Sequence, residues 1–310
     1  FKPLETMTFR AGRIPYEDPS RFTAKGRFDG AALEMDLGPV RLGIAGFYTG
    51  FLYRETANIR ANPGDPVNYA APLDWGDFAD TYFAPPMAIA AVDAEYRGFL
   101  NPRGTLRGGL LGRFDLSRAE AKKHAPFLLL RYTLVFPAVD LSAAAAVELL
   151  PQTGDLRAAF AAALEGGWRL PGARPSRLSL GIRWASGEGP STAAFDPVVS
   201  EAQGRALEPD FSGLMVIRPL YEVRLLPSLH AEAGGRYFLR TDSITLSDPG
   251  LAGDASYLVG LELDGALRWA PFSDISLSLS GGLFIPQTGR AMKDDEPLRW
   301  TVTLGALFSL

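Results

Sequence analysis

The feature that most constrains this chain is a strict alternation of apolar and other residues at its C-terminal end. One face of residues 298–310 is formed by the side chains of Leu298, Trp300, Val302, Leu304, Ala306, Phe308 and Leu310. Polar residues and glycine fill most of the positions between them, with Leu307 as the exception. A period of two places successive side chains on opposite faces of a strand, whereas a helix repeats every 3.6 residues. The segment is therefore predicted to be a β-strand with one apolar face.

The same alternation recurs along the chain in runs of about 10–14 residues that end at turn residues. We predict fourteen strands, near residues 4–13, 28–37, 40–54, 87–100, 105–116, 126–136, 140–150, 155–170, 177–186, 213–225, 229–240, 257–269, 274–285 and 298–310.

One region, residues 141–168, fits two interpretations. It is rich in alanine, and Leu156, Phe160 and Leu164 are spaced as on an amphipathic helix. Charged residues also alternate with these leucines and phenylalanine, as in a strand. We favour strands, because neighbouring segments then keep the same up-and-down topology. If the region is helical, the number of strands falls to twelve.

The predicted connections alternate in length. Short turns are expected at 38–39, 101–104, 137–139, 170–176, 226–228 and 270–273, and most longer connections, at 14–27, 55–86, 187–212, 241–256 and 286–297, fall in the intervening slots. Outer-membrane barrels have short periplasmic turns and long extracellular loops. A soluble β-sandwich has no reason to sort its loops in this way.

Composition excludes several classes of protein. The chain has no cysteine, so it has no disulfide and no thiolate metal site, and its net charge of −4 comes without a basic cluster for nucleic acid. No run reaches the roughly 18 apolar residues that a membrane helix needs. We also find no phosphate-binding loop and no metal-ligand cluster, and we expect no cofactor and no metal.

The face opposite the apolar residues carries many arginines and carboxylates. Burying so many ions without partners would cost far more than folding yields, so this face must be wet or internally paired. In a soluble sandwich the charged face would simply point outward. Against that alternative, aromatic residues such as Tyr96, Trp168, Trp269 and Trp300 recur at strand ends, where membrane proteins place an interfacial girdle.

The last eight residues resemble the β-signal of bacterial outer-membrane β-barrel proteins. That motif has a polar residue, a spacer, glycine, two spacers and two hydrophobic residues one apart, and Thr303, Gly305, Phe308 and Leu310 fill these positions. The terminal residue of the family is more often Phe than Leu. The motif covers eight residues, while the porin-like architecture covers the whole chain.

The resemblance implies a fold and a location. The fold is a transmembrane antiparallel up-and-down β-barrel of about 14 strands (12–16), forming a single domain over residues 1–310. The protein would lie in the bacterial outer membrane, in contact with its lipid, after insertion by the barrel assembly machinery. Assembly as a homo-oligomer or within an envelope complex stays open.

The resemblance also implies a porin-like channel for passive diffusion of small polar solutes or ions. The expected pore-lining residues are Arg97, Arg113, Arg131, Arg183, Arg218, Arg236, Arg268, Glu95, Glu222, Glu232 and Glu262. An acidic loop that folds inward opposite them would form a constriction, and we expect Asp65, Asp74, Asp77 and Asp80 of loop 55–86 in that role. Loop 187–212 is acidic as well. Alternatively, the charges pair between neighbouring strands and only stiffen the barrel.

Two other functions stay open. A hydrophobic-solute transporter of the fatty-acid type would need a plug segment, and none is visible in the sequence. A structural barrel subunit of an envelope complex would use many of the same residues without transport. An enzyme is not expected, because a nucleophile needs a base, and only His124 and His230 are present.

Overall fold

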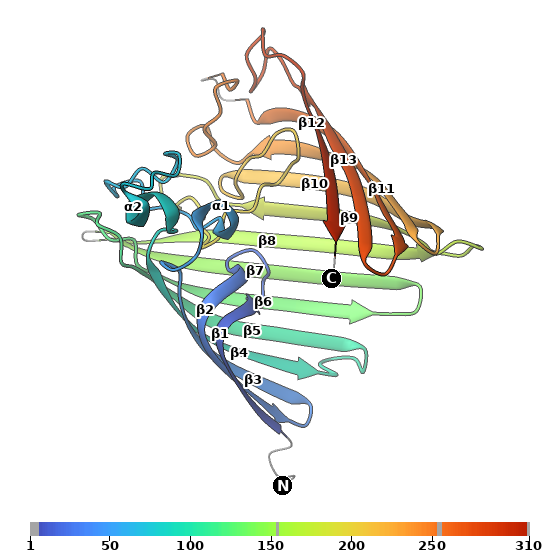
Figure 1. Cartoon of the computed structure of the whole chain (residues 1–310), viewed down its shortest axis with the longest axis horizontal. Helices are drawn as coiled ribbons and strands as arrows, with labels where there is room; N and C mark the ends of the chain where they lie inside the picture. Colours follow the sequence, from blue (N-terminus) through green and yellow to red (C-terminus); the bar gives the residue numbers. More distant parts are fainter. Residues whose placement is uncertain (1–5, 153–154, 253–255, 309–310) are drawn as a thin grey trace. The chain divides into compact units, whose positions relative to one another are not determined.

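The computed structural model describes residues 6–152, 155–252 and 256–308, and it has fourteen β-strands in these ranges (Figure 1). The strands are β1 (Thr6–Glu17), β2 (Lys25–Leu37), β3 (Val40–Tyr48), β4 (Met87–Arg97), β5 (Gly104–Asp115), β6 (Ala125–Val135), β7 (Val139–Gln152), β8 (Asp155–Leu170), β9 (Ser176–Ala185), β10 (Leu214–Leu226), β11 (Leu229–Arg240), β12 (Leu258–Phe272), β13 (Ile275–Pro286) and β14 (Arg299–Phe308). All fourteen predicted strands are confirmed, with most ends within four residues of the predicted ones; β3 was predicted to end near residue 54, and it ends at Tyr48.

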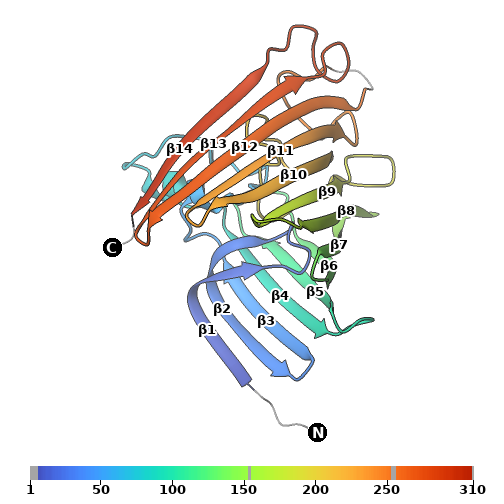
Figure 2. The same ribbon diagram turned by 90° about the vertical axis from the view of Figure 1, so that its right-hand side faces the viewer.

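The strands form one antiparallel sheet in sequence order, from β1 to β14, without a crossover. Figure 2 shows the last five, β10 to β14, side by side. Within the part of the chain that the structure describes, β1 and β14 each pair with a single strand. Because an unpaired strand edge is not tolerated in lipid, both edges need a partner in a membrane.

The contacts divide the chain into two compact units. Unit 1 comprises Phe1–Thr133, Ala144–Ala161 and Pro190–Glu201, and unit 2 comprises Leu134–Ala143, Ala162–Gly189 and Ala202–Leu310. The boundary runs through β6, β7 and β8, which belong to one continuous sheet. It therefore does not test the expectation of a single domain over residues 1–310, which stays a prediction.

The alanine-rich region is β7 and β8, so the strand interpretation is correct and the helical one is wrong. Apolar side chains such as Leu149 and Leu156 are exposed on one face of these strands, 36% and 68% respectively. On the other face Ala146, Ala159 and Ala161 are buried. The backbone of residues 192–193 pairs with Ala158 of β8 in a parallel bridge, with the N–H of Ala193 3.0 Å from the carbonyl of Ala158.

The first hairpin extends further than predicted. We expected a loop over 14–27, but β1 continues to Glu17 and pairs with β2 up to Lys25. Arg13 forms an ion pair of 2.8 Å with Asp29 on the opposite strand. The remaining turn is closed by Asp18, whose buried carboxylate accepts hydrogen bonds from the backbone N–H groups of residues 20, 21, 23 and 24.

Large apolar side chains point outward from the sheet, the reverse of a soluble protein. Exposure reaches 67% for Phe9, 53% for Val92, 62% for Leu110 and 79% for Leu304. We call the face that bears them the outer face, and the opposite one the inner face. The amphipathic pattern is that of strands that contact lipid on one side.

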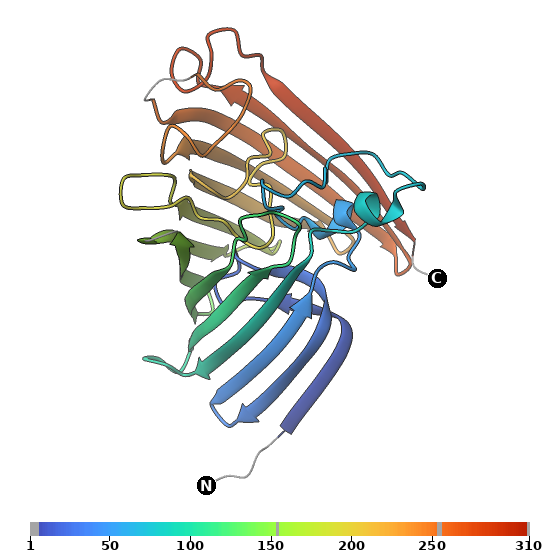
Figure 3. The same ribbon diagram turned by 90° about the vertical axis from the view of Figure 1, so that its left-hand side faces the viewer.

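Two short helices lie in the long connection between β3 and β4: α1 (Arg54–Ala57) and α2 (Phe78–Tyr82). No helix in the described ranges has the length and apolar character needed to cross a membrane. Figure 3 shows this connection together with the strands of unit 1.

Each unit has its own apolar cluster on the inner face. In unit 1, Phe195 is fully buried and contacts the rings of Phe22 and Phe127 edge-on. In unit 2 the cluster comprises Leu207, Leu214, Val216, Phe238, Val259, Phe284, Ala291 and Met292. Both clusters include residues of the connection between β9 and β10, residues 186–213, which we call the inner loop.

Candidate functional site

In unit 1, the inner loop is anchored through Asp196. Its backbone N–H donates to Glu148 Oε2 (2.8 Å), and its carbonyl accepts from Arg113 Nη1 (2.7 Å). Its carboxylate pairs with Arg113 (3.1 Å) and Arg60 (2.8 Å) and lies 3.7 Å from the amine of Lys123. Burial raises the pKa of Asp196, but these three cations lower it more, so the net shift is downward. The carboxylate therefore stays ionised in the loop.

The wall beneath Asp196 is a buried ion pair. Arg113 Nη2 lies 3.0 Å from Glu148 Oε1, and both side chains are almost completely buried. A buried pair is tolerated when further hydrogen bonds satisfy its atoms. Here the inner loop provides them, through the peptide N–H and the carbonyl of Asp196.

In unit 2, Glu262 anchors the second half of the inner loop. Its carboxylate accepts hydrogen bonds from the backbone N–H groups of Arg205, Ala206 and Leu207 at 2.7–2.9 Å. It also accepts one from Arg236 Nη1 at 2.8 Å. Glu262 is fully buried. Four donors converge on one carboxylate, which compensates for its removal from water.

Arg205 brings a positive charge from the inner loop to the wall of unit 2. Its guanidinium contacts Glu232, lies 3.8 Å from Asp264, and donates to the carbonyl of Gly265 (3.1 Å). Arg236 pairs with Asp264 at 2.6 Å. The inner loop thus contributes the carboxylate of Asp196 to unit 1 and the guanidinium of Arg205 to unit 2.

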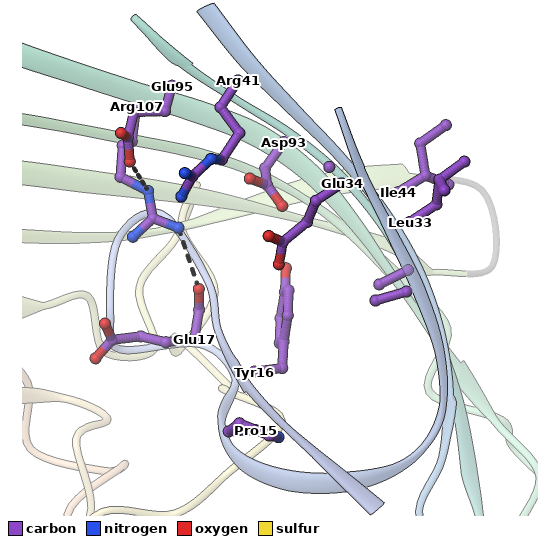
Figure 4. A pocket seen from close by; sticks show the side chains of 13 residues that line it. Pro15, Tyr16, Glu17, Leu33, Glu34, Arg41, Ile44, Asp93, Glu95 and Arg107 are labelled. Atoms are coloured by element: carbon purple, nitrogen blue, oxygen red, sulfur yellow. Dashed lines mark hydrogen bonds and ion pairs between the residues drawn. The ribbon is translucent and has the colours of Figure 1, made fainter. Parts of the chain in front are cut away.

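A cavity of about 270 Å³ opens on the inner face of unit 1 (Figure 4). An alternating row of charges crosses it: Arg41 pairs with Asp36 at 2.8 Å, and Arg107 lies 3.8 Å from Glu95. The register places these four residues opposite one another on β2 to β5. Cross-strand pairing of opposite charges stabilises a sheet and keeps the wall hydrophilic.

Asp93 is the residue of this cavity without a partner. In the described part of the chain its carboxylate forms no hydrogen bond and no ion pair, and Figure 4 shows it beside Glu34 and the hydroxyl end of Tyr16. Two glycines leave it room. A Cβ at Gly43 would lie 2.9 Å from Asp93 Oδ2, and one at Gly109 would lie 3.1 Å from its Cβ.

A second cavity, of about 990 Å³, lies on the inner face of unit 2 near the short turns. Arg224, His230 and Arg268 contribute to its wall from adjacent positions of β10, β11 and β12. Arg177 and Glu222, which are 3.3 Å apart, also line it. Among the residues described, no hydrogen bond or ion pair engages Arg268. The cavity combines apolar side chains such as Val223 and Leu267 with a surplus of positive charge.

The predicted pore-lining residues all lie on strands, but they differ in accessibility. Arg113, Arg236 and Glu262 are buried beneath the inner loop. Arg131 contacts Thr133, Arg183 contacts Gln203, and Glu232 contacts Arg205. Arg97 is bonded to Glu95 at 2.8 Å. Arg218 is half-buried, and its Nε has no hydrogen-bond partner within the described ranges.

The acidic residues expected to form a constriction bond within the loops. Asp80 pairs with Arg118 at 2.7 Å, and Asp65 accepts from the Tyr69 hydroxyl at 2.8 Å. Asp74 accepts from the backbone N–H of Gly76, and Asp77 is exposed. Their role as a constriction stays a prediction.

Sequence reasoning missed the residues that fasten the inner loop. Glu148, Asp264 and Arg205 were not among the predicted site residues. One signal was available for Arg205, because it is the single basic residue of the acidic segment 187–212. A lone cation in an acidic loop indicates a specific carboxylate partner.

The residues of the expected assembly signal lie on the last strand. Thr303 and Gly305 are opposite Ser280 and Ser278 of β13, and Phe308 is 67% exposed at the end of β14. Leu310 lies outside the described residues. The strand position agrees with the motif, and its recognition stays a prediction.

Comparisons with known proteins identify the fold. No protein-family model and no curated protein matches the chain. Solved structures do match, among them three outer-membrane channels of Pseudomonas aeruginosa. OccK3 (OpdO) has 14% identity and a TM-score of 0.58, with 97% of this chain and 76% of that chain covered. OccK10 (OpdN) has 15% identity and a TM-score of 0.57, covering 97% and 79%. OccK11 (OpdR) has 14% identity and a TM-score of 0.55, covering 98% and 78%.

These likenesses define the class of fold. The chain has the all-β, antiparallel, up-and-down fold of outer-membrane β-barrel channels, as the alternating strands predicted.

Proposed function

We propose that the protein is an outer-membrane channel of a Gram-negative bacterium for the passive diffusion of small polar solutes or ions. The observation that carries this proposal is the reversed polarity of the sheet. Apolar side chains such as Phe9 and Leu304 are exposed on the outer face, while arginines and carboxylates line the cavities of the inner face. Lipid on one side and water on the other satisfy both faces.

The inner face favours polar solutes over hydrophobic ones. A path for fatty acids needs a continuous apolar wall, whereas arginines and carboxylates interrupt the lining of both cavities. These side chains would attract, orient or repel ions as they pass. The charged residues of the wall therefore favour a polar solute over a fatty acid.

The inner loop makes the proposed path selective. Its residues are fastened to the wall at Asp196 and Arg205, so that part of the inner face is covered by protein. A covered wall reduces the open cross-section, and the remaining accessible charges then set ion preference. Arg218 and Arg268 are the candidates, because neither has a hydrogen-bond partner in the described part of the chain.

The proposal does not assign catalysis. His124 Nδ1 accepts a hydrogen bond from the backbone N–H of Asp115, so this ring is occupied structurally.

The exposed apolar belt would contact outer-membrane lipid. We also infer that the assembly machinery reads Thr303, Gly305, Phe308 and Leu310 during insertion, and this inference is separate from transport.

Conductance across a planar lipid bilayer tests the function. The refolded full chain is expected to give discrete current steps, with a reversal potential in a salt gradient that reports cation against anion preference. Arg218→Ala and Arg268→Ala should shift that potential toward cation selectivity, because each removes a positive charge that no ion pair neutralises in the described part of the chain. Arg174→Gln, in the exposed turn between β8 and β9, is the matched control.

Each possible outcome has a clear meaning. Absence of current from a chain that shows the heat-dependent gel shift of a folded barrel would favour a structural subunit. Unchanged ion selectivity in both arginine variants would show that Arg218 and Arg268 do not set the ion preference of the channel.

A further inference from the structure

The connection between β3 and β4 carries a stack of aromatic rings that has no role in the proposed channel. Trp75 stacks on Phe78, with ring centroids 5.7 Å apart and planes at 12°. Phe78 stacks in turn on Tyr82 (4.6 Å, 20°), and Tyr82 packs on Tyr53 (4.8 Å, 34°). Trp75 lies at the end of the stack and is 80% exposed. One indole face is therefore covered by Phe78, and the other is available.

The turn that presents Trp75 is held in place. The buried hydroxyl of Thr81 donates to the carbonyl of Asp77 (2.7 Å) and lies 3.0 Å from the carbonyl of Asp74. The same oxygen accepts from the backbone N–H of Asp74 at 3.0 Å. Asp74 Oδ1 accepts from the N–H of Gly76 at 2.8 Å. The indole is thus a preorganised surface, which reduces the entropy lost on binding.

Two carboxylates near Trp75 in the sequence have no cation paired with them among the described residues. Asp74 and Asp77 are exposed, and neither forms an ion pair among the described residues. The nearby Asp80 is neutralised by a two-pronged contact with Arg118. The arginines of the same connection are directed elsewhere, Arg54 to the carbonyl of Ala71 and Arg60 to Asp196.

We propose that Trp75, Asp74 and Asp77 form a binding site for a planar organic cation, such as a small aromatic ring that carries a quaternary nitrogen. The ring continues the stack on the free face of Trp75, and its charge lies over the indole and beside the two carboxylates. Aromatic faces attract cations through their quadrupole, most strongly on tryptophan. The proposal does not rest on transport, because it concerns only this connection.

The charge distribution selects this occupant over others. A lipid surface rich in phosphate would be repelled by Asp74 and Asp77, and a neutral ring would gain stacking only. A cation gains both stacking and Coulomb attraction. The contribution from the carboxylates must also weaken with salt, because they are exposed.

Three probes with one pyridine ring and different charge test the site on the refolded full chain. They are 1-methylnicotinamide (cation), nicotinamide (neutral) and nicotinate (anion). We expect saturable quenching of tryptophan fluorescence by the cation, at least tenfold weaker binding of the neutral ring, and no saturable quenching by the anion. Raising the salt from 20 mM to 500 mM should reduce the affinity for the cation several-fold.

Variants assign the signal to these residues. Trp75→Phe should abolish the saturable component, while Trp300→Phe, at an exposed tryptophan of β14, should leave it unchanged. Asp74→Asn with Asp77→Asn should reduce the affinity for the cation to that for nicotinamide. Asp294→Asn with Asp295→Asn changes the net charge equally in a different loop and should have no effect.

The opposite results overturn the proposal. Equal affinity for the cation and the neutral ring would show that the carboxylates play no part. Full quenching in Trp75→Phe would place the site elsewhere. Quenching of Trp75 by lipids with brominated acyl chains would make this residue a membrane anchor. Conductance is not involved in any of these measurements, so failure here leaves the channel proposal intact.

Discussion

Replacing Glu262 by glutamine is expected to release residues 205–207 from the inner face of unit 2. The carboxylate accepts four hydrogen bonds, three from backbone N–H groups and one from Arg236. A glutamine amide keeps one acceptor oxygen and turns an NH₂ group toward the remaining donors. At least two of the four hydrogen bonds are then lost.

The magnitude follows from the number of bonds. A hydrogen bond to a charged group contributes about 1.5–3 kcal/mol, so losing two weakens the anchor by about 3–6 kcal/mol. At 1.4 kcal/mol per factor of ten, the ratio of released to bound loop rises by about 10²–10⁴-fold. Glu232→Gln, which touches only the side chain of Arg205, should cost about 1 kcal/mol and serves as the control.

Limited trypsin digestion in detergent measures this release. Cleavage after Arg205 divides the chain into residues 1–205 and 206–310, and it requires that the loop leave the wall. The Glu262→Gln variant should be cut much faster than either the parent or Glu232→Gln, and its single-channel current should be noisier. Equal resistance in all three folded proteins would refute the role of Glu262 as the anchor.

Three further predictions follow from the same structure. Because the pKa of Asp196 is lowered, its contribution to the attachment of the inner loop is present above the ordinary value of 3.8 and is lost as pH falls through the lower folded value. Current noise should therefore be constant from pH 8 to 5 and rise only below about pH 4. A rise near pH 6 would contradict this role of Asp196. Val92→Arg, on the outer face, should destabilise the protein in vesicles by about 2–4 kcal/mol in denaturant unfolding, and no loss of stability would place Val92 outside the lipid. Phe308→Ala should slow insertion by the assembly machinery in a pulse-chase experiment, and normal insertion would argue that Phe308 is not read.

The strands could be predicted because their alternation is a local property of the sequence. Leu304 and its alternate neighbours specify an apolar face without reference to any other segment. Alanine in β8 has no such preference, and its assignment depended on the topology of adjacent strands. The end of β3 was misplaced, because it depends on a distant contact: the hydroxyl of Thr49 donates to the carbonyl of Pro85 at 2.5 Å, which turns the chain after Tyr48.

The inner wall was only half predictable. Its charged residues could be identified from the alternation of side chains along each strand, but their partners lie far away in the sequence. Glu148 meets Asp196 across 48 residues, and Glu262 meets Arg205 across 57. The inward-folding acidic loop was expected at residues 55–86, and that stays a prediction, whereas the inner loop contacts the wall through Asp196 in unit 1 and through residues 205–207 in unit 2. Only the fold reveals such pairing.

The central claim is that the two faces of each strand contact different solvents, and cysteine labelling tests it most directly. Because the chain has no cysteine, every introduced thiol is unique. Single cysteines at positions 92–96 of β4, in protein reconstituted into vesicles, should react with a charged, water-soluble thiosulfonate at positions 93 and 95 only. The Asp93→Cys thiol, on the inner face, is expected to react, and the Val92→Cys thiol, 53% exposed on the outer face, is expected to be protected by lipid. Equal reactivity at all positions, or the reverse phase, would contradict the account.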